Sequence, residues 1–202
     1  MDARLVDDAL EAIRAGRPIV LPTDTVYGLC TTPYDADAVA ELRRLKGRDE
    51  QQPIALLASD VDLLYECVPE LRGPAEVLIE ALLPGPLTLV FPNPARRFSW
   101  LTGARPDTIG VRVPELEGDA KAVVHRVGSV AATSANLTGG PDPKTLDEVP
   151  HEIRSAVAVA LDGGELPGTP STVVDLTGPE PQILREGAMS ATEVLKRLGQ
   201  LV

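Results

Sequence analysis

The chain has 202 residues, of which 44% are hydrophobic and 24% charged, a composition typical of a folded domain rather than a disordered segment. Thirty acidic against nineteen basic residues give a net charge of −11, so the overall field opposes binding to nucleic acid or to an anionic membrane. With two cysteines and two histidines, the sequence excludes a disulfide framework and a Cys/His zinc cluster.

The hydrophobic pattern predicts helices and strands that are interspersed along the chain. Helices are expected over 5–13, 37–47, 74–83, 119–126 and 190–199. The first should stop at Gly16, and Asp37 should cap the second. Strands are expected over 19–21, 53–57, 87–91, 108–113, 130–132, 157–161, 171–176 and 182–184, and a Gly/Pro-rich loop over 136–144.

Some of these strands follow one another directly, which favours a mixed α/β (α+β) sheet over a doubly wound one. No internal repeat or linker-like stretch divides the sequence, so we expect a single domain over 1–202. The acidic N-terminus is unlike a signal peptide, and no apolar run approaches the roughly 18 residues that span a bilayer. We therefore expect a soluble, cytoplasmic protein without membrane contact.

Several common catalytic motifs are missing. No Gly-x-Gly-x-x-Gly follows a strand, and no Gly-x-Ser-x-Gly elbow is present. The stretch 139–145 resembles a P-loop, but Pro143 stands before Lys144 where a glycine is needed, and proline has no N–H to offer a phosphate. We expect His125 on a helix and His151 at the start of a loop, where packing is a more common role than catalysis. We expect both cysteines to be small core residues.

Polar side chains gather in four clusters, at 22–29, 46–48, 133–136, and 171–175 with 183–187. Each also has a structural interpretation, such as a turn, a cation at a helix end or a loop cap. If the last two strands are neighbours, Ser171 and Arg185 can meet at one end of the sheet. Arg112 stands inside an apolar strand and needs an anionic partner if it is buried.

Together the clusters supply cations and hydroxyls, with almost no acid/base or thiol chemistry. Phosphoryl or nucleotidyl transfer relies mainly on positioning and charge stabilisation, so this set of groups suits that reaction class. Lys46, Arg48, Arg112 and Arg185 could hold a triphosphate, a carboxylate, or both.

In this order, the motifs Pro-Thr-Asp-Thr-Val-Tyr-Gly-Leu, Lys-x-Arg, Pro-Gly-Pro-Leu-Thr, Ser-Ala-Asn and Ser-Thr-Val-Val-Asp, followed by Ile-Leu-Arg, resemble those of YrdC-like proteins. The chain is similar to the threonylcarbamoyl-AMP synthase family from about Leu5 to Ala188. The resemblance implies a twisted mixed sheet, flanked by helices, around a concave cationic pocket.

The resemblance also implies a nucleotidyltransferase activity, in which L-threonine, bicarbonate or CO2, and ATP give threonylcarbamoyl-adenylate and pyrophosphate. Mg2+ would accompany ATP, and no metal would be held by the protein itself. The product would pass to threonylcarbamoyl-transferase machinery that modifies adenosine 37 of tRNAs reading codons that begin with A. Weak RNA binding would be compatible with this role.

Matching motif to motif, the resemblance implies two sets of binding residues and a catalytic subset. Threonine would contact Thr25, Arg112, Ser134 and Ser171. ATP would contact Lys46, Arg48, Gln52, Thr108, Asn136, Lys144 and Arg185, with Thr23 and Thr145 near the same pocket. Lys46, Arg48 and Arg185 would stabilise the charge that grows on the phosphates.

The sequence departs from the family pattern at three places. Gln52 stands where relatives often carry asparagine, and Leu57 where some carry a histidine near threonine. The sequence ends at Val202, so we expect the single-domain form rather than the longer one with an extra C-terminal domain. Two alternatives stay open: a YrdC-like paralogue that binds nucleotide or double-stranded RNA without synthase activity, and carbamoyl transfer as in hydrogenase-maturation proteins.

Overall fold

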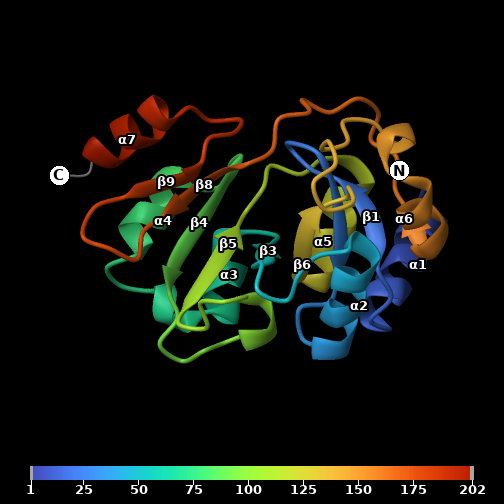
Figure 1. Ribbon diagram of the computed structural model, residues 1–202, viewed down its shortest axis with the longest axis horizontal. Coiled ribbons are helices and arrows are strands. Elements are labelled where there is room, and N and C mark those ends of the chain that lie inside the picture. Colours follow the sequence, from blue (N-terminus) through green and yellow to red (C-terminus); the bar gives the residue numbers. More distant parts are fainter. Residues whose placement is uncertain (1, 201–202) are drawn as a thin grey trace.

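A computed structural model describes residues 2–200 and contains helices and strands in alternation (Figure 1). The helices are α1 (Ala3–Arg14), α2 (Ala36–Lys46), α3 (Val61–Cys67), α4 (Glu76–Leu82), α5 (Gly118–Val127), α6 (His151–Ala156) and α7 (Ala191–Gly199). The strands are β1 (Ile19–Pro22), β2 (Tyr27–Thr31), β3 (Ala55–Ala58), β4 (Leu87–Pro92), β5 (Thr108–Arg112), β6 (Ser129–Ser134), β7 (Val159–Ala160), β8 (Thr172–Asp175) and β9 (Gln182–Arg185). Within these residues, none of the helices is long and apolar enough to cross a membrane.

All the strands belong to one sheet in the order β7-β1-β2-β6-β3-β5-β4-β8-β9. The pairs β1–β7, β3–β5 and β4–β8 are parallel, and the other neighbours are antiparallel. The sheet is strongly twisted, so that β1 runs across the direction of β4 and β5 in the view of Figure 1. The expected mixed α/β fold is therefore confirmed.

The ends of the helices follow ordinary capping chemistry. Asp35, and not Asp37 as the sequence suggested, caps α2, because its carboxylate accepts hydrogen bonds from the backbone N–H groups of Asp37 and Ala38. Asp37 lies in the first turn of the helix instead. Gly47 ends α2 in the left-handed conformation, with φ of 64°, as its position in the sequence predicted.

Three elements were not expected from the pattern. The strand β2 is buried at all five positions and therefore lacks the alternation that marks a half-exposed strand. The helices α3 and α6 have seven and six residues, too few for a helical period to stand out. His151 begins α6 rather than a loop, and α4 is shorter than the expected 74–83 helix.

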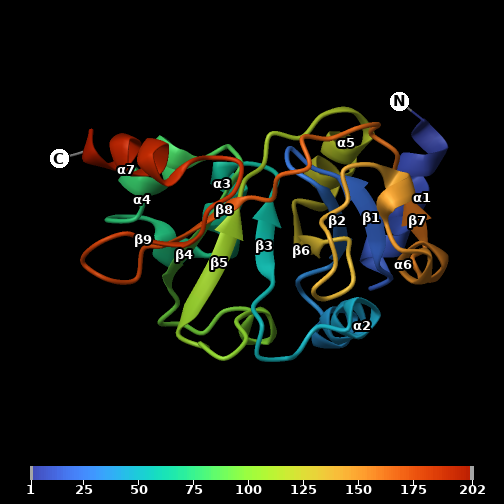
Figure 2. The ribbon, with the colours of Figure 1, turned by 45° about the horizontal axis from the view of Figure 1, so that its top comes forward.

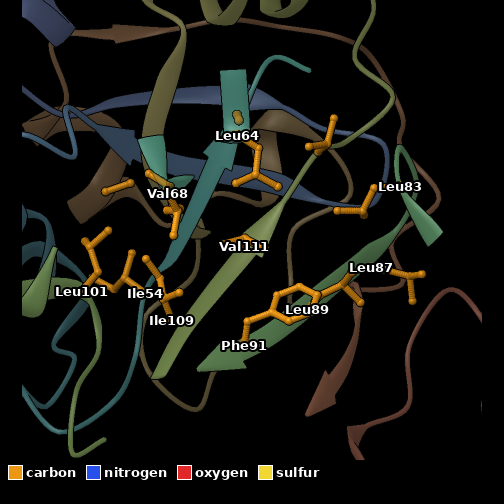
Figure 3. Close-up of a cluster of buried hydrophobic side chains, with 14 of the residues drawn as sticks. Ile54, Leu64, Val68, Leu83, Leu87, Leu89, Phe91, Leu101, Ile109 and Val111 are labelled. Carbon is orange, nitrogen blue, oxygen red and sulfur yellow. The ribbon is translucent and has the colours of Figure 1, made fainter. Parts of the chain in front are cut away.

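One face of the sheet packs against α2, α3, α4, α6 and α7 and forms the larger hydrophobic core. Figure 3 shows part of this core, where Leu89 and Phe91 of β4 lie near Ile109 and Val111 of β5. Alternate residues of these strands point to opposite faces, so the residues between them face away from this core.

The other face carries only α1 and α5, which pack on β1, β2, β3 and β6. These two helices contact each other on the N-terminal half of the sheet, whereas α4 and α7 lie side by side near its far end (Figure 2). Within residues 2–200 the remaining part of this face, over β5, β4 and β8, is left without a covering helix, and it is there that the structure has room for a ligand.

A segment from Leu161 to Ser171 crosses over the sheet from β7 at one edge to β8 near the other (Figure 1). Tyr27 holds this segment, because its buried hydroxyl accepts from the N–H of Gly163 and lies 2.9 Å from Asp162 Oδ1 and 2.8 Å from the Gly164 carbonyl. Burial, the nearby carboxylate of Asp162 and its hydrogen bond raise the pKa of Tyr27 to about 12.

We expect Tyr27→Phe to lower the free energy of unfolding by about 1–3 kcal/mol, because the crossing segment loses its hydrogen-bond partner. Urea denaturation of the two proteins measures the difference. Tyr65→Phe is the matched control: the Tyr65 hydroxyl is buried without a partner among residues 2–200, so its removal costs nothing. Equal losses in both variants would contradict this role of Tyr27.

Candidate active site

A cavity of about 340 Å³ lies on the uncovered part of the sheet, a volume within the range of small-ligand sites. Alternate residues of β5 form its floor, and Gly110 at the centre keeps that floor open because it has no side chain. Six of the eleven predicted site residues line the cavity. They are Arg48, Thr108, Arg112, Ser134, Ser171 and Arg185.

Arg112 is buried in β5 and has the anionic partner that such a residue needs. It donates through one nitrogen to Asp24 Oδ1 at 2.5 Å and to Thr25 Oγ1 at 3.3 Å. Burial lowers the pKa of Arg112, and the charge of Asp24 opposes that shift. Its Nε atom is buried without a hydrogen-bond partner among the described residues.

The turn that carries Asp24 is held by its own threonines. Thr23 Oγ1 accepts from the N–H groups of Thr25 and Val26 and donates to the Val26 carbonyl at 2.7 Å. Both interpretations of this cluster therefore hold: it is a hydrogen-bonded turn, and Thr23 and Val26 also line the cavity.

Lys46 is the last residue of α2 and is buried behind the cavity wall. Its ammonium donates to the side-chain and carbonyl oxygens of Ser134 and of Asn136. Burial, together with the charges of Arg48 and Arg185, lowers the pKa of Lys46 to about 8. Lys46 thus acts on the cavity through its charge and through the position of Ser134.

Arg48 follows Gly47, the cap of α2, and lines the cavity. It donates to the Pro53 carbonyl at 2.7 Å and is 3.4 Å from Thr133 Oγ1. Its Nε is buried without a partner among residues 2–200. Burial lowers the pKa of Arg48, and the charges of Arg43 and Arg185 lower it further.

Arg185 and Ser171 meet as the sequence suggested, because β8 and β9 are antiparallel neighbours. The Arg185 guanidinium donates to the Ser171 carbonyl at 2.7 Å and 3.1 Å and to its hydroxyl at 3.2 Å. The same hydroxyl is 2.8 Å from Thr88 Oγ1. Thr88 and Ser171 thus place two hydroxyls at the wall beside an arginine.

The cavity wall is strongly cationic although the chain as a whole is acidic. Within the described part of the chain, Lys46, Arg48 and Arg185 have no carboxylate within 4.0 Å and bind neutral oxygens instead. Like charges held together without counter-charges favour an anionic ligand.

The remaining predicted residues do not line the cavity. Thr25 and Asn136 lie behind the wall, bonded to Arg112 and Lys46. Gln52 is exposed, although its neighbour Gln51 lines the cavity. Lys144 forms an exposed ion pair with Glu165 at 2.8 Å, away from the lining.

Sequence reasoning missed several residues at the site. Thr88, Gly110 and Arg105 line the cavity, and Asp24 binds Arg112. Arg43 is buried and donates to the carbonyls of three residues, Asp49, Gln52 and Trp100, so it fixes the loop that borders the cavity. The alternation of β4 and β5 could have assigned Thr88 and Gly110, but the contacts of Asp24, Arg43 and Arg105 depend on the folded chain.

The site offers no protein nucleophile of ordinary reactivity. Burial raises the pKa of the Cys30 thiol to about 12, so the thiolate is strongly disfavoured. Within residues 2–200, no group of three or more His, Cys, Asp and Glu side chains is arranged to hold a metal ion. The arrangement can bind and orient anionic reactants and stabilise charge on them.

Comparisons with known proteins agree on one family. Residues 11–187 match the model of the Sua5/YciO/YrdC family, described as "Telomere recombination". A Shigella boydii protein named threonylcarbamoyl-AMP synthase is 35% identical over 185 residues, which cover 89% of this chain and 94% of the relative.

Two solved structures have the same fold. Sua5 of P. abyssi complexed with L-threonine matches with a TM-score of 0.87 and 34% identity over 96% of this chain. Our chain spans only 57% of that protein. YciO of E. coli matches with a TM-score of 0.79 and 26% identity, covering 95% of this chain and 92% of YciO. The chain therefore belongs to the Sua5/YciO/YrdC family.

Proposed function

We propose that this chain is an L-threonylcarbamoyladenylate synthase, a nucleotidyltransferase that uses L-threonine, bicarbonate or CO2, and ATP. Relatives that are 35% identical carry the name threonylcarbamoyl-AMP synthase, and the P. abyssi structure contains L-threonine. The observation that carries the proposal is the cavity wall itself, where cations without carboxylate partners stand beside hydroxyls and a buried arginine.

In this proposal the carboxylate of threonine binds Arg112. Arg112 lines the cavity, and arginine suits a carboxylate because its planar group presents parallel N–H bonds. The hydroxyls of Ser134 and Ser171 are in the same wall and can bind the polar groups of threonine. Arg48 and Arg185 bind the triphosphate of ATP, which carries Mg2+ as part of the substrate.

The chemistry needs no covalent intermediate on the protein. Bicarbonate takes up a proton and loses water to give CO2. The threonine amine attacks the carbon of CO2 and releases a proton, forming a carbamate. A carbamate oxygen then attacks the α-phosphorus of ATP, and the bond from that phosphorus to the bridging oxygen breaks. Pyrophosphate leaves with the electron pair, and the product is a mixed anhydride of the carbamate and AMP.

The protein's part in this reaction is positional and electrostatic. Arg48 and Arg185 neutralise the charge that develops on the pyrophosphate. Lys46 adds its charge from behind the wall and fixes Ser134 and Asn136. We leave Gln52 and Lys144 out of the ATP contacts because neither side chain is in the lining.

A carbamoyl-adenylate is a reactive anhydride, so a transferase must consume it soon after it forms. We assign that step to the threonylcarbamoylation of adenosine 37 in tRNA, which places the protein in the cytoplasm with that machinery. The net charge of −11 opposes a primary role in RNA binding.

Pyrophosphate release from MgATP tests the proposal when L-threonine and bicarbonate are omitted in turn. We expect release only when both are present. Arg185→Ala should lower kcat/KM by about 100-fold, because a charge-stabilising donor at the reacting phosphates is lost. Arg126→Ala is the matched control, since Arg126 forms an exposed ion pair with Asp7 outside the cavity. Release without threonine, or ATP binding with no release, would overturn the synthase and favour a nucleotide-binding or RNA-binding paralogue.

The pKa of Lys46 generates a second prediction. With a pKa of about 8 in the ligand-free protein, Lys46 loses its charge as the pH rises above that value. The phosphates of ATP favour the charged ammonium form of Lys46, so the affinity for ATP should fall above about pH 8. For the same reason, ATP binding near pH 8 should be accompanied by proton uptake. Calorimetry in two buffers with different ionisation enthalpies measures this uptake.

The comparison between two lysine variants isolates the effect. Lys46→Met should abolish the proton uptake that is due to this residue, while Lys196→Met, on the exposed side of α7, should retain it. An ATP affinity of the unmodified protein that does not change between pH 7 and pH 9.5 would contradict the role of Lys46.

A further inference from the structure

Two loops border the cavity, and they contact each other. The α2–β3 loop, residues 47–54, carries Arg48, and the β4–β5 loop covers residues 93–107. Both loops contribute residues to the cavity lining. They are joined by a backbone hydrogen bond, in which the Ile54 N–H donates to the Leu101 carbonyl at 2.8 Å. Figure 3 shows these two residues next to each other.

Arg43, a buried residue of α2, forms hydrogen bonds with both loops. One terminal nitrogen of its guanidinium donates to the Asp49 carbonyl at 3.1 Å and to the Gln52 carbonyl at 2.6 Å. The other terminal nitrogen donates to the Trp100 carbonyl at 3.0 Å. Asp49 and Gln52 belong to the α2–β3 loop and Trp100 belongs to the β4–β5 loop, so one guanidinium bridges the two loops.

Arg48 depends on the same α2–β3 loop for its own position. Its guanidinium donates to the Pro53 carbonyl at 2.7 Å, and Pro53 directly follows Gln52, whose carbonyl binds Arg43. Two successive carbonyls of one loop therefore bind the two arginines. A rearrangement of the loop that breaks the bonds to Arg43 also moves the Pro53 carbonyl, and it changes where the Arg48 guanidinium lies at the cavity wall.

Arg43 can influence the site through its charge or through these hydrogen bonds. Burial lowers the pKa of Arg48, and the charge of Arg43 lowers it further, so the two guanidinium groups are close enough to repel each other. The hydrogen bonds, however, need the shape of arginine, whose planar group directs N–H bonds towards both loops. A lysine keeps the charge but has all its donors on a single nitrogen, so it does not bridge the loops.

We infer that Arg43 is a positioning residue, which holds Arg48 through the α2–β3 loop where Arg48 meets the phosphates of ATP. This inference rests on the proposed function for the identity of the ligand. Arg43 is outside the cavity lining, so it acts through Arg48 and not by touching the substrate. Such a role matters because a misplacement of about 1 Å in a reacting complex can lower the rate about 100-fold.

Titration calorimetry with MgATP tests the inference in a double-mutant cycle. Arg43→Lys should raise the Kd of ATP about tenfold although it retains the charge, because the bridge between the loops is lost. In an Arg48→Ala background the same substitution should change the Kd less than about twofold, because the residue through which Arg43 acts is absent.

The neighbouring residue of α2 provides the matched control. Arg44 forms an exposed ion pair with Glu41 and lies outside the cavity lining, so Arg44→Ala should leave the Kd of ATP unchanged. In turnover experiments, Arg43→Lys should raise the KM for ATP and not the KM for threonine, because Arg112 is held by Asp24 instead of by this loop.

A second variant disturbs the contact between the loops from the opposite side. Gly103 in the β4–β5 loop has a φ of 63°, and a Cβ atom there would collide with the Gln51 carbonyl. Gly103→Ala therefore pushes the loops apart while both arginines remain. We expect it to raise the Kd of ATP as Arg43→Lys does, and to lose that effect in the Arg48→Ala background. Urea denaturation of each variant shows that the comparison is between folded proteins.

Full rescue by lysine would overturn the inference, because the charge of Arg43 would then be sufficient. An equal rise in the Kd of ATP with and without Arg48 would overturn it too, since the effect would not pass through Arg48. An unchanged Kd in Gly103→Ala would also contradict it. These binding measurements need neither threonine nor turnover, so a failure of the synthase proposal in the pyrophosphate assay is distinguishable from a failure of this inference.

Discussion

The structure depends on holding several like charges together on one face of the sheet. Arg48, Arg112 and Arg185 line one cavity, and Lys46 is buried behind its wall. Among residues 2–200, Asp24 is the only carboxylate within 4.0 Å of any of these four cations. Repulsion between these cations opposes folding, and backbone carbonyls and side-chain amide or hydroxyl oxygens offset it. An anionic ligand offsets the repulsion between the cations, so the same arrangement favours binding of anions.

The sheet makes this possible by treating its two faces differently. Five helices cover one face and form the larger core, while α1 and α5 cover only part of the other. Alternation along β4 and β5 then places apolar residues in the core and Thr88, Gly110 and Arg112 in the cavity. Tyr27, from the strand β2, ties down the segment that brings Ser171 to the cavity rim, so the site and the sheet are stabilised by shared contacts.

Much of this could be predicted from the sequence, for identifiable reasons. A glycine at the end of a helical pattern predicted the end of α2 at Gly47, and polar residues after the predicted strands indicated the site. Arg112 and Arg185 could be identified because each is a charged residue in an apolar strand pattern. The strand β2 was not predicted, because it is buried throughout and lacks alternation. The cap of α2 was assigned to Asp37 instead of Asp35, because the two aspartates are close together in the sequence. The ion pair of Arg105 with Asp175 and the position of Lys46 behind Ser134 depend on strand pairing across the sheet, which no local pattern contains.

The account's central claim is that a cationic cavity without a protein nucleophile joins three reactants by positioning them. The most direct test is to run the reaction with 13C-bicarbonate and 15N-threonine and to examine the product by mass spectrometry and NMR. We predict a mixed anhydride of a carbamate and AMP, in which the labelled carbon is bonded to the labelled nitrogen. A product that contains AMP or ADP without the labelled carbon would contradict the claim.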